Sequence, residues 1–277
     1  MRKTLIAILF AVVAPASYAS FSVDLPIVTR AQGATTTFYT AIDVSNNSAQ
    51  ATDVTFEYLS ADLSVNASGT LVSNLAPHAN FHQDDLIQYL GTQGYISSDK
   101  VASTFGTLLL TFTNPSFTSG NEASASARVW NYLTSGQRPS IGLAYRAIPL
   151  RLNGSHTVTS VIQDTSATSG NAPSIVTNMG LENIGIDDSG NVTTGAATIQ
   201  LTFYDATTGS QVGPQPTVSL QPGQVTQINN VWGAYGLPTS TNNILVVATE
   251  TSGTAQIRGY ISLKDTSTND GSFFFMQ

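Results

Sequence analysis

Apolar and polar residues alternate along much of the chain, which is the pattern of strands that bury one face. The alternation is clearest at residues 53–58 and 198–203. Further strands are expected at residues 38–44, 106–112, 123–132, 175–181, 244–249 and 255–263. Segments rich in Gly, Asn, Asp and Ser separate them, and residues 205–209 and 269–271 are typical of hairpin turns. Short strands joined by turns predict an all-β fold of antiparallel sandwiches.

One short helix is expected in each half of the chain. Residues 84–91 and 229–236 share three features in the same order: an Asp or Asn that can cap a helix, an apolar face, and a terminal Gly. Each helix is expected to cover an open end of a sandwich, because a layer of strands must bury its apolar face.

The chain repeats itself once. Residues 40–46 align with 177–183, residues 53–58 with 198–203, and residues 127–130 with 257–260. A match of this length marks repeated structural units. We therefore expect two tandem β-sandwich domains, at residues 20–150 and 151–277, each within the usual size of a single domain.

Two motifs resemble a known class of protein. The opening Leu25-Pro26-Ile27-Val28, followed by Gly33 and a strand leading into Asn46 and Asn47, is similar to the start of tandem immunoglobulin-like β-sandwich repeats in secreted bacterial proteins. The segments Leu75-Ala76-Pro77 and Leu220-Gln221-Pro222-Gly223 resemble the turn before the short helix of such repeats. The resemblance implies a two-domain protein outside the cytoplasm, of a kind usually without assigned activity. Residues 160–174 depart from it, since the proline-marked opening is weak there.

The first 19 residues have the features of a secretory signal peptide. Arg2 and Lys3 precede the apolar run 5–13, and Ser17-Tyr18-Ala19 is typical of a cleavage site. No later stretch approaches the roughly 20 apolar residues of a spanning helix, so no membrane insertion is expected. The chain has no cysteine and therefore no disulfide. These features predict a secreted protein, either extracellular or periplasmic.

The charge of the chain argues against nucleic acid as a partner. Without Arg2 and Lys3, the ten basic residues become eight, against 17 acidic residues. Binding to phosphates needs clustered Lys and Arg. Only 10% of the residues are charged, whereas soluble domains carry about 25%. Thr, Ser, Asn and Gln are thus expected to form most of the polar surface.

Catalytic and metal-binding motifs are weak, and no catalytic residue, metal ligand or cofactor is assigned. No Gly-x-Ser-x-Gly motif occurs, and the Ser-x-x-Lys spacing at residues 97–100 lacks its companion Lys-Thr-Gly. The three histidines are scattered, and a transition-metal site needs three or four ligands. Residues 187–191 are rich in oxygen ligands but do not match a calcium-loop register, so the sequence leaves two interpretations, a calcium site or a solvated turn.

The strongest candidate for binding is an outward strand face in each half. Alternation places Arg128, Trp130 and Tyr132 on one outward face, and Arg258 and Tyr260 on the other. An Arg beside an aromatic residue is either a local cation–π stack that a neighbouring loop or the other domain covers, or a contact surface. The second alternative follows because Trp, Tyr and Arg dominate binding hot spots.

We therefore expect a secreted, non-enzymatic structural or interaction protein of a bacterial cell surface or extracellular matrix. Its partner would be another protein or a second copy of the chain. Carbohydrate recognition through the exposed aromatic face is the alternative, and an unrecognised hydrolase is a weaker one.

Overall fold

The structure is a computed structural model that describes residues 20–32, 36–114, 122–131, 140–149, 155–163, 175–189, 191–265 and 271–277. The proposed signal peptide at 1–19, the segment 150–154 at the expected domain boundary, most of residues 160–174 and the turn residues 269–270 lie outside the described residues. The described part is all-β with antiparallel sheets, as the alternation predicts.

The strands of the first half form two layers. Sheet A has the order β4-β3-β6-β1 and sheet B the order β5-β2-β7-β8. The bounds are β1 Ser20–Gln32, β2 Thr37–Asn46, β3 Thr52–Ser60, β4 Ala67–Leu75, β5 Asn80–Gln83, β6 Thr104–Thr113, β7 Ala123–Asn131, β8 Ser140–Arg146 and β9 Ile148–Pro149. The end of β1 pairs with β2, which joins the two layers at that edge.

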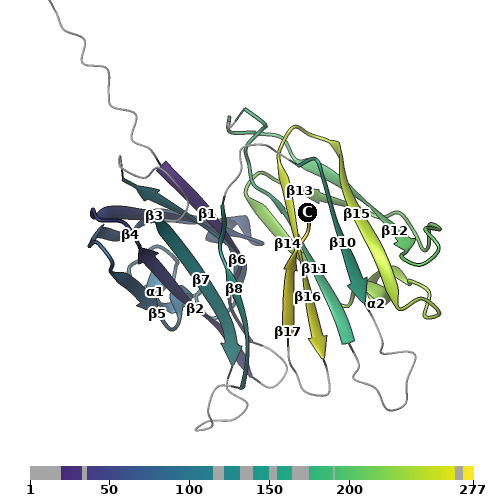
Figure 1. The fold of residues 1–277 in the computed structure, drawn as a ribbon, viewed down its shortest axis with the longest axis horizontal. Helices are drawn as coiled ribbons and strands as arrows, with labels where there is room; N and C mark the ends of the chain where they lie inside the picture. Colours follow the sequence, from purple (N-terminus) through teal and green to yellow (C-terminus); the bar gives the residue numbers. More distant parts are fainter. Residues whose placement is uncertain are drawn as a thin grey trace, which may run out of the picture.

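The strands of the second half form two further sheets. Sheet C has the order β10-β15-β12-β13, and sheet D the order β14-β11-β16-β17. The bounds are β10 Thr157–Gln163, β11 Ile175–Asn183, β12 Ala197–Asp205, β13 Thr217–Leu220, β14 Gln224–Ile228, β15 Asn243–Ser252, β16 Ile257–Asp265 and β17 Gly271–Phe275. Strand for strand, sheet C has the order of sheet A and sheet D the order of sheet B (Figure 1).

Equivalent polar residues make equivalent hydrogen bonds in the two halves. Thr40 Oγ1 donates to the carbonyl of Thr29, and Thr177 Oγ1 donates to the carbonyl of Gln163. Asn46 Nδ2 donates to the Leu75 carbonyl, as Asn183 Nδ2 does to the Leu220 carbonyl. All four side chains are buried. They satisfy backbone groups that the sheets leave unpaired, which explains why the sequence repeats at these positions.

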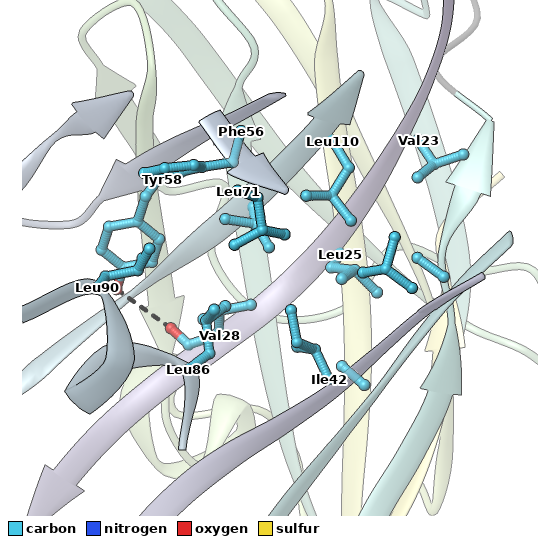
Figure 2. Packing of buried hydrophobic residues seen from close by; sticks show 14 of the residues in the cluster. Val23, Leu25, Val28, Ile42, Phe56, Tyr58, Leu71, Leu86, Leu90 and Leu110 are labelled. Atoms are coloured by element: carbon cyan, nitrogen blue, oxygen red, sulfur yellow. Dashed lines mark hydrogen bonds between the residues drawn. The ribbon is translucent and has the colours of Figure 1, made fainter. Parts of the chain in front are cut away.

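Alternating apolar residues fill the space between the two layers of each half. In the first half, Leu25, Ile42 and Leu110 meet from both sheets, and Tyr58 donates a hydrogen bond to the Val28 carbonyl at 3.2 Å (Figure 2). In the buried apolar cluster of the second half, Phe203 takes the position that Tyr58 has in the first half. Phe56 is 3% exposed and Leu201 is fully buried, which confirms the faces that alternation predicts for these strands.

The two expected helices are present. Helix α1 spans Leu86–Thr92 and is capped by Asp85, whose carboxylate accepts from the Gln88 amide. Helix α2 spans Val231–Tyr235, with Asn230 accepting from the Gly233 amide. Gly236 ends α2 in a left-handed conformation, as a C-terminal Gly predicts. A 3₁₀ turn at Leu63–Val65 is an additional element that the sequence pattern does not predict.

One part of the expected sequence alignment is wrong by four residues. The equivalent residues Asn46 and Asn183 lie opposite Ala123 and Ile257. Arg258 therefore corresponds to Ser124 and not to Arg128. The shift escapes detection by alternation because an even number of residues keeps every side chain on the same face.

Candidate functional site

The outer face of sheet B carries the candidate aromatic residues of the first half. Tyr39 of β2 lies opposite Trp130 of β7, and their ring centroids are 5.1 Å apart. The Arg30 guanidinium lies 5.4 Å from the centre of the Tyr39 ring, so the cation–π contact of this half involves Arg30. Trp130 Nε1 donates to the Asp84 carbonyl at 3.1 Å. This arrangement fixes the indole while leaving part of it exposed.

Arg128 is exposed on the same face, two residues before Trp130. Tyr132, the third residue of the expected patch, lies outside the described residues. Ser124 and Ser126 continue the face toward Asp43 and Arg146, and together with Ser45 they line a hollow of about 480 Å³. The outer face of sheet B thus combines a rigid aromatic pair, an exposed cation and a hollow of small polar side chains.

The corresponding face of the second half is covered. Tyr260 is only 2% exposed and belongs to the cluster of buried residues of the first half. Its ring stacks on Phe273, which stacks in turn on Tyr145 of the first half at 4.9 Å. Its hydroxyl donates to Gln227 Oε1 at 2.8 Å. Tyr260 is therefore not on an exposed surface. Alternation shows that a residue lies outside its own pair of sheets, but it cannot reveal a second layer that covers the residue there.

Arg258 also faces the first half. Its Nη1 lies 2.9 Å from Asp24 Oδ2, and the Asp24 side chain is completely buried. Thr107 donates a second hydrogen bond to Asp24, at 2.6 Å. The contact of Arg258 is thus an ion pair between the halves and not a cation–π stack with Tyr260.

A third ionisable group lies in this interface. Glu182, on the strand beside Arg258, is 3% exposed, and neither of its carboxylate oxygens has a hydrogen-bond partner among the described residues. Burial, followed by the nearby Asp24 carboxylate, raises the pKa of Glu182 well above its ordinary value, and Arg258 only partly opposes this. Neither Asp24 nor Glu182 is among the site residues that the sequence predicts. The sequence does contain one indication that Glu182 is unusual, since it aligns with the neutral Ser45 of the first half.

A cavity of about 730 Å³ lies between the two halves. Its walls combine apolar residues, neutral polar groups and one cation, including Phe38, Phe105, Leu143, Asn178, Asn229 and Lys264. A concave site with a few polar groups is the usual form of a small-molecule site. No acidic side chain lines it within the described part of the chain.

The weaker chemical motifs are engaged in other contacts. Lys100 Nζ lies 2.9 Å from Asp62 Oδ2, and this hydrogen bond raises the pKa of Lys100, which opposes a role as a general base for Ser97. Asp187 accepts from the backbone amides of Ser189 and Asn191 at 2.8 Å each, so its carboxylate closes a turn.

The histidines form two separate bridges. His82 lies 3.0 Å from both Asp43 and Asp84, and its hydrogen bonds to these carboxylates raise the pKa of His82. His156 bridges Glu250 and Asp188, which raises its pKa in the same way. Across the described ranges, no group of three or more His, Asp or Glu side chains could hold a metal ion.

Comparisons with known proteins give distant structural likenesses only. No family model matches the chain, and no curated protein sequence matches it. The chain is similar to the apo form of the Pleurotus ostreatus lectin POL, with 12% identity over 93% of this chain and 75% of that one, at a TM-score of 0.21. It is also similar to the pilus backbone RrgB of Streptococcus pneumoniae, with 11% identity over 92% of this chain and 80% of that one, at a TM-score of 0.21. Likenesses at this level carry no argument about function.

The part of the chain that the structure describes contains no helix of the length and hydrophobicity needed to cross a membrane.

Proposed function

We propose that this is a secreted, non-enzymatic structural or interaction protein that acts through protein contacts made by the outer face of sheet B. The observation that supports this most directly is the different use of one face in the two halves. In the second half, the outer face of sheet D is covered by another β-sandwich layer through Arg258 and Tyr260. In the first half, the equivalent face presents Arg128 and the Tyr39–Trp130 pair with part of their surface exposed.

The chemistry of this face suits protein recognition. Trp, Tyr and Arg are enriched among residues that dominate binding energies, and an aromatic pair that is already held in place loses little entropy on binding. Trp130 is held by its hydrogen bond to the Asp84 carbonyl and by the Tyr39 ring. Localisation at a bacterial surface or in an extracellular matrix is part of the same proposal and is supported by the signal-like residues 1–19.

The test compares two variants of this face, Trp130→Ala and Arg128→Glu, with the wild-type chain. Self-association is measured by sedimentation, and binding is measured to the surface fraction of the producing cells. We expect both variants to lose the contact while the free energy of unfolding changes by about 1 kcal/mol or less, the range for residues outside the core. Phe274→Ala removes an exposed aromatic side chain elsewhere and serves as the control. Variants that associate and bind like the wild type would refute the proposal.

Carbohydrate recognition is a second candidate, favoured by the same partly exposed Trp130. Partly exposed aromatic rings can also stack on sugar rings, and Tyr39 and Trp130 are both partly exposed. A glycan array separates the two candidates, since a Trp130-dependent glycan signal would support carbohydrate binding over protein contact.

A further inference from the structure

The cavity between the two halves has an apolar wall that continues the core of the first half. Ala127 and Tyr145 pair on the inner face of sheet B and are buried. Two residues away on the same face, Val129 pairs with Leu143, and both line the cavity with part of their surface exposed. Phe38 of β2 extends this wall. Protein interiors are packed almost without voids, so partly exposed apolar side chains around a space of about 730 Å³ leave room for an apolar group.

The opposite wall is mainly polar and belongs to sheet D, whose strand β17 lies beside β8 of the first half (Figure 1). Asn178 of β11 pairs with Ser262 of β16 on the outer face of this sheet, and both line the cavity. Gln227 and Lys264 line it from the neighbouring positions on either side of that pair. The cavity is therefore apolar on the side of the first half and mainly polar on the side of the second.

The hydrogen bonds of the polar wall leave donors available for a ligand. Asn178 Oδ1 accepts from the Asn230 amide at 3.0 Å, so the Nδ2 group of Asn178 remains. The Tyr260 hydroxyl donates to Gln227 Oε1 at 2.8 Å, and Gln227 Nε2 donates in turn to Asn229 Oδ1 at 2.6 Å. This relay ends on the Nδ2 group of Asn229. Within the described residues, neither of the two Nδ2 groups has a hydrogen-bond partner, so both can donate to an acceptor in the cavity.

The charge at this polar end is positive. Lys264 is exposed, and no acidic side chain among the described residues lines the cavity with it. Glu182 lies on the same face four residues from Asn178, about 13 Å along an extended strand. The Tyr260 ring lies over Gly180 between them. Two amide donors and an ammonium group, away from the buried carboxylates, suit the oxygen atoms of a carboxylate, because hydrogen bonds to a charged acceptor are the stronger ones.

We propose that the cavity between the halves binds a small amphipathic carboxylate. The carboxylate of the ligand accepts hydrogen bonds from Asn178 and Asn229 beside the Lys264 ammonium group. Its alkyl chain or ring lies against Val129 and Leu143 on the opposite wall. The volume of the cavity is in the usual range of small-molecule sites. The outer face of sheet B takes no part in this site, so the inference goes beyond the proposed function.

The test titrates the full mature chain with four probes in a calorimeter, below the concentrations at which the probes form micelles. Decanoate, decanol and decyltrimethylammonium share one alkyl chain and differ in the head group, and acetate has the carboxylate without the chain. We expect decanoate to bind one per chain and most tightly, decanol to bind more weakly, and the cation and acetate to bind least. Decanoate should also raise the melting temperature, because a ligand of the folded state stabilises it.

Three variants locate the site. Asn178→Asp retains an oxygen for the Asn230 amide but replaces the donor by an anion, so decanoate should bind about tenfold more weakly or worse. Decanol should bind this variant as it binds the wild type, which shows that the cavity is intact. Lys264→Gln should weaken decanoate about threefold, the effect of an exposed charge. Lys100→Gln is the matched control, since Lys100 is paired with Asp62 outside the cavity, and it should leave the binding of decanoate unchanged.

Three results would overturn the inference. The first is a wild-type chain that does not bind decanoate, and the second is decanoate that binds no more tightly than decanol. The third is an Asn178→Asp variant that binds decanoate like the wild type. Trp130→Ala separates this inference from the proposed function, because Trp130 does not line the cavity. We expect this variant to bind decanoate normally whether or not it loses its contacts through sheet B, and a loss of decanoate binding in it would count against the cavity as the site.

Discussion

The ion pair between Arg258 and Asp24 gives a prediction whose size follows from the structure. We expect Arg258→Met to lower the free energy of unfolding at neutral pH by about 3 kcal/mol, near the lower limit for removing one partner of a buried pair. The Asp24 side chain is completely buried, and the Arg258 side chain is 15% exposed. The substitution leaves the buried Asp24 carboxylate with the hydrogen bond from the Thr107 hydroxyl, and it removes the cation that lowers the pKa of the neighbouring Glu182.

The cost should be smaller when both charges are removed. Asp24→Asn can retain the hydrogen bond from Thr107, and Met fills much of the volume of the Arg stem. Replacing a complete buried pair is often nearly neutral. The double variant Asp24→Asn/Arg258→Met should therefore be more stable than Arg258→Met alone, by about 2 kcal/mol. The two single losses should also sum to more than the loss of the double variant, as expected of residues in one network.

Urea unfolding of the four proteins, followed by fluorescence, measures these quantities. Trp130 lies in the first half and Trp232 in the second, so Trp130→Phe and Trp232→Phe backgrounds report each half separately. If the ion pair joins the halves, Arg258→Met should also separate their two transitions.

A loss below about 1 kcal/mol for Arg258→Met, which is the range of an exposed pair, would contradict this prediction. The prediction would equally fail if Arg258→Met cost the same in the Asp24→Asn background, because the two side chains would then be energetically independent.

Two further predictions concern single buried residues. Phe56→Ala should cost about 3 to 5 kcal/mol in urea unfolding, as a large-to-small change in a filled core, and a cost under 1 kcal/mol would mean that its contacts contribute little. Glu182→Gln should flatten the pH dependence of stability. Because burial raises the pKa of Glu182 in the folded state, its contribution is largest below the ordinary value of 4.5 and falls as pH rises from there toward the folded-state value. Unfolding measured from acidic to mildly alkaline pH should show wild-type stability declining relative to Glu182→Gln, and parallel curves would contradict this.

Much of the fold within each half could be predicted from local pattern. Alternation located β3 and β12, since each buries one face in the core of its own half. Side-chain caps located both helices, because Asp85 and Asn230 bond to amides only three residues away. These features depend on neighbours in sequence or on a single buried face, which a linear pattern records.

The candidate site was predicted less completely. The sequence leaves two interpretations of the Arg–aromatic motif in the second half, a contact surface or a packing device covered by a loop or by the other half, and in the structure Tyr260 is buried against the first half. The alternation of a strand distinguishes the inside of a sandwich from its outside, and it contains no information on a second body that covers the outside. Tyr39 was also missed, because its pairing with Trp130 depends on the register of two distant strands.

The pattern of divergence between the two copies carries the information that alternation lacks. Thr40 and Asn46 are retained as Thr177 and Asn183 because each satisfies backbone groups inside its own half. The two halves share residues at these positions because the surroundings of the residues are alike. The outer faces differ. Ser124 on sheet B and Arg258 on sheet D lie at equivalent positions, yet one side chain is small and neutral and the other is large and charged. Ser124 and Arg258, which differ in size and charge, lie where sheet D is covered by the first half and sheet B is exposed, so the outer face of sheet B is the surface to substitute first.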